Sequence, residues 1–370
     1  MNPSFIRYGI GVDLSKDHFD ACIKALTVEE NEAIIATRKF ANTLKGCQDF
    51  HTWVQAKQLD QALVCRVLLE VTGIYHETLA YFLFQNDYYV SIELGKRTRK
   101  FIQSLGQDSK NDQQDCRGLA SMALHRKVHR WQPAGKHLYK VRQILRLRKS
   151  LVTNKVSLQN QLRAAERAYH KCTEVINALK KMIKNMEAQI TKLEKQAMAL
   201  LKRDTEIFQR AWGIQQSLPG VGILTLMEII AETDGFNLIT SVKQLISYAG
   251  YDIIEKQSGK SAGKTCISKN GNARIRATMY MPALAHIRLK KGPLYDLYVR
   301  LIERNGGLKK KAQVAVQRKL LCLIYSLWKS GEEYDPEYHL KSQTENQQLH
   351  PQKNSSSEVP ELHGIDTDKP

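Results

Sequence analysis

Residues 1 to about 130 alternate short apolar runs with polar segments. Apolar runs of strand length, alternating or continuous, predict five strands. They lie at 7–14 (RYGIGVDL), 18–26 (HFDACIKAL), 32–40 (EAIIATRKF), 62–70 (ALVCRVLLE) and 88–94 (YYVSIEL). Apolar positions at helical spacing predict helices at 76–85, 99–105 and 111–126. The mixture predicts an α/β domain over residues 1–135.

The span 138–203 is helical in pattern throughout and contains neither glycine nor proline. In its second half, apolar or small residues alternate three and four positions apart, which is the spacing of a coiled-coil seam. The seam residues are Ile176, Leu179, Ile183, Met186, Ile190, Leu193, Ala197 and Leu200. One unbroken helix and a helical hairpin fit the pattern equally well. We expect a long helical coiled coil over residues 136–212, with a seam suited to dimerisation.

Residues 213–335 predict a mostly helical C-terminal domain. It opens with SLPGVGILTLMEIIAE (217–232), passes through a polar loop rich in glycine, serine and lysine, and ends with KAQVAVQRKLLCLIYSLWKSG (311–331). The tail at 336–370 is polar and poor in aromatic residues, so we expect it to be disordered and to carry no chemistry.

The charge of the chain narrows the class of partner. The 370 residues include 56 lysines and arginines against 37 aspartates and glutamates, a formal net charge of +19. This favours a polyanionic partner, nucleic acid before a membrane surface. The sequence shows no signal-peptide pattern and no apolar run long enough to span a bilayer. Its seven scattered cysteines form no CxxC pair, which predicts reduced thiols in a cytoplasmic protein rather than a zinc site or disulfide framework.

Four acidic residues stand at element boundaries. Asp13 and Glu70 each end an apolar strand, whereas Asp112 and Asp115 share one face of a predicted helix. RNase H-like folds place metal ligands in this way, and two Mg²⁺ ions take such oxygen ligands. The alternative is structural, with acids that merely end strands and favour a helix N-terminus. Weaker candidates are Asp20, Glu93 and Asp108.

Two glycine-containing segments in the C-terminal domain could approach phosphate. Gly220 and Gly222 precede a predicted helix, where backbone N–H groups can face a phosphate, although an ordinary turn fits as well. The loop at 257–276 carries three serines and several cations. They are Ser258, Ser261, Ser268, Lys260, Lys264, Lys269, Arg274 and Arg276. A nucleophilic serine needs exposure, nearby positive charge and a base, and only the first two are evident. Spacing alone therefore selects no nucleophile, and the cations also fit a simple phosphate-positioning patch.

The early part of the long helical span is strongly basic. Arg142, Arg146, Arg148 and Arg163 predict a stripe that contacts a nucleic-acid backbone, and a solvated helix face is the alternative.

Taken together, the motifs resemble the DEDD transposases of bacterial insertion sequences, the IS110 family, which are relatives of the Piv site-specific invertase. In the first domain the resemblance rests on GVDLSK with Asp13, LLEVTGIYHETLAYFL with Glu70, and KNDQQDCRGLA with Asp112 and Asp115. In the C-terminal domain it rests on LPGVGILTLMEIIAE, LISYAGYDIIEKQSGK, ISKNGNARIR and YDLYVRLIERNGG. It covers about residues 6 to 335. One departure is visible: Asn111 and Cys116 stand where many relatives have threonine and alanine.

The resemblance implies a RuvC-like, that is RNase H-like, N-terminal domain joined by a coiled coil to a C-terminal transposase domain. It implies that Asp13, Glu70, Asp112 and Asp115 bind two Mg²⁺ ions. Ser258 in QSGK matches the family's nucleophilic serine, which forms a covalent phosphoserine link to DNA. Such enzymes are guided by a noncoding bridge RNA that pairs with donor and target DNA, and they act as dimers that join into tetramers.

Two other functions compete with a recombinase of this kind. A hydrolytic RuvC-like nuclease, such as a junction resolvase, would use the four acids and water without a covalent intermediate. A non-catalytic nucleic-acid-binding protein would need neither the acids nor Ser258. The four acids argue against the last interpretation.

Overall fold

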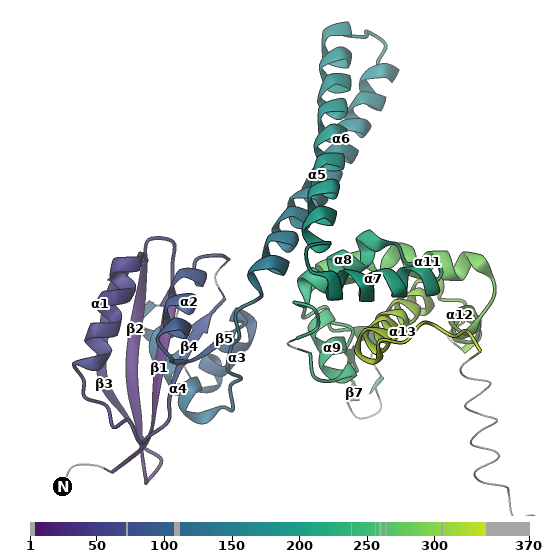
Figure 1. Cartoon of the computed structure of the whole chain (residues 1–370). Coiled ribbons are helices and arrows are strands. Elements are labelled where there is room, and N and C mark those ends of the chain that lie inside the picture. Colours follow the sequence, from purple (N-terminus) through teal and green to yellow (C-terminus); the bar gives the residue numbers. More distant parts are fainter. Residues whose placement is uncertain are drawn as a thin grey trace, which may run out of the picture. The chain divides into compact units, whose positions relative to one another are not determined.

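The computed structural model describes residues 4–71, 73–106, 112–237, 239–255, 257–258, 261–262, 265–304 and 306–337. The chain forms two compact units, one ending at Ala134 and the other beginning at Gly135. The first contains a five-stranded sheet and the second is mostly helical (Figure 1). The tail that the sequence predicts to be disordered lies, from residue 338 onward, outside the described residues.

The sheet of the first unit confirms all five strands predicted from the hydrophobic pattern. They are β1 (Phe5–Leu14), β2 (His18–Thr27), β3 (Glu32–Ala41), β4 (Cys65–Glu70) and β5 (Tyr89–Glu93). Their order in the sheet is β3-β2-β1-β4-β5. The first three strands form an antiparallel meander, and β4 and β5 run parallel to β1.

Helices cover both faces of this sheet. The helices of the unit are α1 (Leu44–Gln55), α2 (Glu77–Gln85), α3 (Gly95–Ser104) and α4 (Asp112–His125). One face packs on α1 and α2, with Phe19 and Phe50 among its fully buried side chains. The other face packs on α4, where Leu68 of the sheet meets Leu119. Sequence analysis missed α1, which the side chain of Thr43 caps by accepting a hydrogen bond from the Gly46 N–H at 3.2 Å.

The helix α4 lies unusually close to β1 because β1 has glycine where the two meet. A Cβ atom at Gly11 would lie 2.1 Å from the Cys116 carbonyl oxygen, and one at Gly9 would lie 2.6 Å from that of Ala120. Gly11 meets the first part of α4 and Gly9 meets a later part, so α4 and β1 run in opposite directions. The first turn of α4 therefore lies over the carboxyl end of β1, where Asp13 stands.

The second unit begins with an antiparallel helical hairpin of α5 (Lys136–Arg167) and α6 (Thr173–Leu201) (Figure 1). The predicted seam on α6 faces α5 of the same chain, and Leu179, Ile183, Ile190 and Ala197 are buried there. Ion pairs cross the hairpin, including Lys155 to Glu187 at 3.5 Å. Of the two forms that the sequence allowed, the structure adopts the hairpin, and α5 covers the seam that suggested a dimer contact.

The remainder of the second unit is mostly helical, as predicted. Its helices are α7 (Thr205–Ser217), α8 (Ile223–Glu232), α9 (Val242–Ala249), α10 (Ala273–Thr278), α11 (Tyr280–Leu289), α12 (Pro293–Arg304) and α13 (Lys309–Ser330). Two short ribbons pair β6 (Ile253–Ile254) with β9 (Cys266–Ile267) and β7 (Gln257–Ser258) with β8 (Ser261–Ala262). The base of the hairpin shares the core of these helices, since Leu138, Val141 and Leu201 pack in the same cluster as Trp328. Within the described part of the chain, none of the helices has the length and apolarity that crossing a membrane requires.

Candidate functional site

Acidic side chains form a row across one edge of the five-stranded sheet. Val12 of β1 is in register with Leu69 of the parallel strand β4, so the next residues, Asp13 and Glu70, are neighbours. Glu70 is in turn paired with Glu93 on β5, and Asp13 with Asp20 on β2. Residues in register point to the same face of a sheet, and for Asp13 this is the face of Gly11, which α4 covers. The predicted proximity of Asp13 and Glu70 is thus present in the fold.

The outer acids of the row are paired with exposed cations of the same unit. Glu93 lies 3.0 Å from Nη1 of Arg97, and Asp20 lies 3.7 Å from Nζ of Lys39. The inner acid Glu70 instead accepts a hydrogen bond from the Thr98 hydroxyl at 2.5 Å. The contrast distinguishes Glu70 from Asp20 and Glu93, which sequence analysis ranked lower.

A glycine at the start of α3 makes room for the Glu70 carboxylate. A Cβ atom at Gly95 would lie 2.6 Å from Oε1 of Glu70. Together with the hydroxyl of Thr98 one turn later, this fixes where the carboxylate lies.

Asp115 brings a further carboxylate to this edge from the first turns of α4. Its side chain is 14% exposed, and its Oδ1 atom is buried without a hydrogen-bond partner among the described residues. The nearest cation is Arg99, whose Nη1 lies 4.0 Å away. The next residue, Cys116, contacts Gly11 two positions before Asp13. A buried carboxylate oxygen left in this state is costly, and a bound cation would satisfy it.

The donor set suits a hard divalent cation. Asp13, Glu70 and Asp115 offer only oxygen ligands, the type that Mg²⁺ and Mn²⁺ prefer. Among the described side chains, no group of three or more histidine, cysteine or acidic residues is close enough to hold a metal ion. The side chain of Asp112 is not among the described side chains, and Asp108 lies outside the described residues. The Oδ1 atom of Asp115, which is buried without a hydrogen bond, and the row of strand-end acids are the features that fit the ion.

Two buried thiols lie beneath α4 beside these acids. Cys22 of β2 and Cys116 of α4 pack together with Ala120. The hydrogen bond from Cys116 lowers the pKa of Cys22 to about 7, helped by Thr37, Lys24 and Arg117 against the effect of burial. The pKa of Cys116 is raised by its hydrogen bond to Cys22, by burial and by the negative charges of Asp20 and Asp13. All seven cysteines are free.

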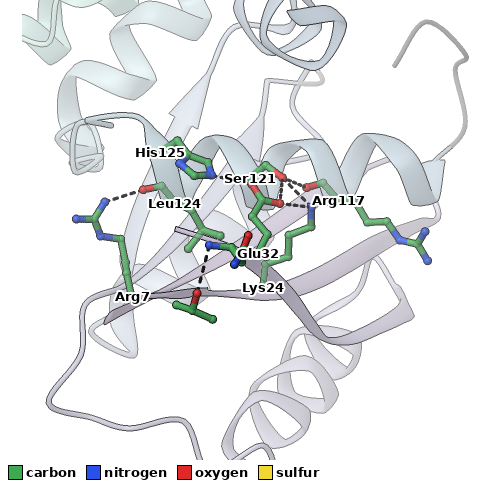
Figure 2. Close-up of polar contacts among 9 residues, drawn as sticks. Arg7, Lys24, Glu32, Arg117, Ser121, Leu124 and His125 are labelled. Carbon is green, nitrogen blue, oxygen red and sulfur yellow. Dashed lines mark hydrogen bonds and ion pairs between the residues drawn. The ribbon is translucent and has the colours of Figure 1, made fainter. Parts of the chain in front are cut away.

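A second polar cluster anchors the other end of α4, and sequence analysis did not identify it (Figure 2). Nζ of the buried Lys24 donates to Oε2 of Glu32 and to Oγ of Ser121, both at 2.7 Å. The Ser121 hydroxyl lies 2.8 Å from the same Glu32 oxygen, and Nε2 of His125 lies 2.8 Å from Oε1. Arg7 adds a 2.6 Å hydrogen bond to the Leu124 carbonyl. The available signal was a lysine at position 24 within the otherwise apolar run 21–26 (ACIKAL) of β2.

Ser258 belongs to the second unit, in the two-stranded ribbon. It ends β7 and is paired with Ser261 of β8. The side chains of Ser258 and Ser261 are not among those that the structure describes, and Lys260 lies outside the described residues.

Most of the predicted phosphate-binding arginines have partners within the second unit. Arg146 forms a bidentate pair with Glu232, with both distances 2.8 Å, and Arg148 lies 2.7 Å from Glu194. Arg276 donates to the carbonyl oxygen of Ala249 at 2.6 Å. Arg163, Lys269 and Arg274 are exposed, although Arg274 approaches Glu232 at 3.9 Å.

The two glycines predicted to face a phosphate have different local roles. Gly222 precedes α8 directly and has open space around it. Gly220 has a φ of +77°, and a Cβ atom there would lie 3.1 Å from the Cβ of Ala285 on α11. A turn that must pack against α11 accounts for Gly220 without a ligand.

Comparison with known families now decides what kind of protein carries this site. Residues 10–171 match the model for DEDD-type transposases of the IS110 family, and residues 214–299 match the model for transposases of the IS116/IS110/IS902 family. Together the matches span about two-thirds of the chain. The chain belongs to the IS110 family of transposases. Members act on DNA by phosphoryl transfer, so the predicted class of enzyme is confirmed.

Curated relatives of this IS110-family transposase match over most of its length. The pilin gene-inverting protein of Moraxella bovis is 28% identical over 331 residues, which cover 89% of this chain and 98% of that protein. The pilin gene-inverting protein of Moraxella lacunata is 27% identical over the same shares. The transposase for insertion sequence element IS1111A of Coxiella burnetii is 24% identical over 355 residues, 88% of this chain and 90% of that protein.

Proposed function

We propose that this transposase cuts and rejoins DNA through a covalent phosphoserine link formed by Ser258. Asp13, Glu70, Asp112 and Asp115 would hold Mg²⁺ for the reaction. The observation that best supports this is the register of β1 and β4, which makes Asp13 and Glu70 neighbours beneath the first turn of α4. Acids that serve only to end strands have no need to meet in this way.

The topology of the first unit supports an RNase H-like, RuvC-like fold. The sheet is a three-stranded antiparallel meander followed by two parallel strands, in the order β3-β2-β1-β4-β5. Its candidate metal ligands come from the central strand, the neighbouring parallel strand and a helix on one face. The two-unit division and the α5–α6 hairpin support, in turn, a transposase domain joined through a coiled coil.

The reaction divides between the two sets of residues. Bound Mg²⁺ would neutralise the charge that develops on the phosphate oxygens. The Ser258 Oγ attacks the phosphorus and loses its proton, while the bond to one sugar oxygen breaks and that oxygen gains a proton. In the second step a strand's terminal hydroxyl attacks the phosphoserine and releases Ser258. Because each step exchanges one phosphate ester for another, rejoining needs no external energy source.

The proposal extends to the partners of the enzyme. With a net charge of +19, the chain suits the simultaneous binding of DNA and a noncoding bridge RNA. The exposed cations Arg163, Lys269 and Arg274 are available for backbone contacts. We also propose a homodimer that assembles into a tetramer in the cytoplasm. Since α5 covers the seam of α6, protomers would meet through other surfaces.

The test is a search for covalent protein–DNA adducts on denaturing gels, with DNA that carries the element's ends. We expect wild-type protein and a Ser261→Ala control to form adducts. Ser258→Ala should form none, because the nucleophile is missing, and Asp13→Asn should form none, because the metal site is lost. Adducts that persist in Ser258→Ala would refute the serine mechanism. Mg²⁺-dependent cutting without adducts in any variant would favour a hydrolytic nuclease.

A further inference from the structure

A pocket of about 210 Å³ lies between α5, α8 and α10 in the second unit. Its apolar lining, here called the floor, consists of the buried Leu145 and Ala231 and the exposed Ala273 and Ala277. Its rim is cationic, and the cations are Arg142, Arg146, Lys149 and Arg274. The positions 142, 146 and 149 fall on one face of α5, so three of these side chains reach the pocket from the same helix.

The two acidic residues of the pocket, Glu228 and Glu232, are already paired with cations of the same unit. Burial alone would raise the pKa of Glu232, but hydrogen bonds from Arg146 and Asn272 and the nearby arginine charges outweigh it, so this pKa lies below its usual value. Asn272 donates to Oε2 of Glu232 at 2.8 Å. Glu228 is bonded to the Thr278 hydroxyl and lies 3.5 Å from Arg148.

The remaining cations leave the rim with surplus positive charge. Within the described structure, Lys149 has no carboxylate within ion-pair distance and Arg274 only a distant one, at 3.9 Å. The Nε of Arg142 is buried without a hydrogen-bond partner among the described residues, while its guanidinium lies 5.1 Å from the ring centre of Tyr139. Because Arg142 lines the pocket and no carboxylate of the described residues lies within ion-pair distance of it, its guanidinium can pair with an anion there.

An apolar floor beneath a cationic rim suits a ligand with one anionic end and one flat apolar end. Inorganic phosphate would leave the floor unused, and a pocket of this volume is too short for a lipid chain. We propose that this pocket holds one unstacked nucleotide of a bound strand, with its phosphate on Arg142 and Lys149 and its base on the floor. The inference rests on the proposed nucleic-acid function, and it adds a strand-binding site that belongs to the second unit and uses none of the four acids.

The test is the binding of short single-stranded oligonucleotides to the full chain, followed by fluorescence anisotropy at several salt concentrations. Two probes share one length, and the second lacks all bases. Ala277→Leu fills the floor without changing charge, so we expect it to weaken binding of the intact probe by about tenfold and to leave the abasic probe unaffected. DNA and RNA versions of both probes identify which strand enters the pocket.

Charge variants test the rim. Arg142→Gln combined with Lys149→Gln should weaken both probes by about tenfold and reduce the salt-dependence slope by about 0.7, the value for one lost phosphate contact. Lys192→Gln on the exposed face of α6 removes a comparable charge and should leave both probes unchanged. The melting temperature of each variant reports whether it is folded.

The inference would be overturned if Ala277→Leu bound the intact probe with the affinity of the wild-type protein. It would also be overturned if Ala277→Leu lost the same affinity for the intact and the abasic probe. Should Ala277→Leu fail to fold, photocrosslinking of wild-type protein to a bromouracil-containing strand decides instead. Crosslinks to residues 273–278 support the pocket, and crosslinks confined to other segments refute it. If Ser258→Ala loses its adducts but Ala277→Leu binds the intact probe as the wild type does, only the pocket inference is refuted. If the wild-type chain binds no oligonucleotide, the proposed function is refuted as well.

Discussion

The cluster of Lys24, Glu32, Ser121 and His125 provides the sharpest test of how α4 is held on its sheet (Figure 2). The perturbation is Glu32→Ala, which removes the carboxylate that accepts from Lys24, Ser121 and His125. The side chain of Lys24 is 9% exposed and that of Glu32 is 25% exposed, so the ammonium would keep only the Ser121 hydroxyl as a partner.

The expected magnitude follows from this burial. Removing one partner of a fully buried ion pair costs about 3–5 kcal/mol because a charge is left without compensation. Since Glu32 is partly exposed, water can reach the lysine once the carboxylate is gone, and we expect about 2–3 kcal/mol. The double variant Lys24→Met, Glu32→Ala removes both charges, so it should be less destabilised than Glu32→Ala alone.

Hydrogen exchange of the amides of α4, followed by mass spectrometry on the full chain, measures the loss of stability within the first unit itself. Glu29→Ala is the control, because Glu29 is exposed in the turn between β2 and β3. Its effect should stay within about 0.5 kcal/mol. A loss of α4 protection in Glu32→Ala no larger than in Glu29→Ala would refute the reasoning, and so would a double variant less stable than either single one.

Three further predictions concern the same unit. Burial would raise the pKa of Glu32, but its hydrogen bonds and the Lys24 charge outweigh this and lower the pKa below 4.5. The stability that the Glu32 carboxylate contributes is therefore complete above about pH 4.5 and is lost as the pH falls through the lowered pKa. In thermal melts, Glu32→Gln should lose less stability on acidification than the wild type. Gly11→Ala places a Cβ atom 2.1 Å from a backbone oxygen of α4, so it should cost about 3 kcal/mol by hydrogen exchange, whereas Gly213→Ala in open space should not destabilise. Asp115→Asn removes charge from a crowded acidic edge, so without metal it should raise the melting temperature while abolishing DNA joining in a gel assay.

The strands and the strand-end acids could be predicted from the sequence because their signals are local. An apolar run located β1, alternating polarity located β2, and the acids that end β1 and β4 pointed to one edge. The helix α1 was missed although Cys47, Phe50 and Val54 are spaced for a helix, because polar residues dilute that segment.

Long-range pairing accounts for what local pattern could not predict. A seam on α6 is satisfied equally well by α5 or by a second chain, so the sequence left the hairpin open. The basic residues of α5 suggested a phosphate-binding stripe, yet Glu232 and Glu194, which neutralise Arg146 and Arg148, come from distant helices. Likewise, the position of Lys24 made sense only once Ser121 of α4 lay beside it.

Titration of the full chain with Mn²⁺, followed by electron paramagnetic resonance, tests most directly whether the acids at the sheet edge form one metal site. The control is Glu93→Gln, which changes an acid of the same row that Arg97 already neutralises. We predict that wild-type protein and Glu93→Gln bind two Mn²⁺ ions and that Asp13→Asn and Asp115→Asn lose them. Binding by Asp13→Asn equal to that of the wild type, or no binding by the wild type, would contradict the account.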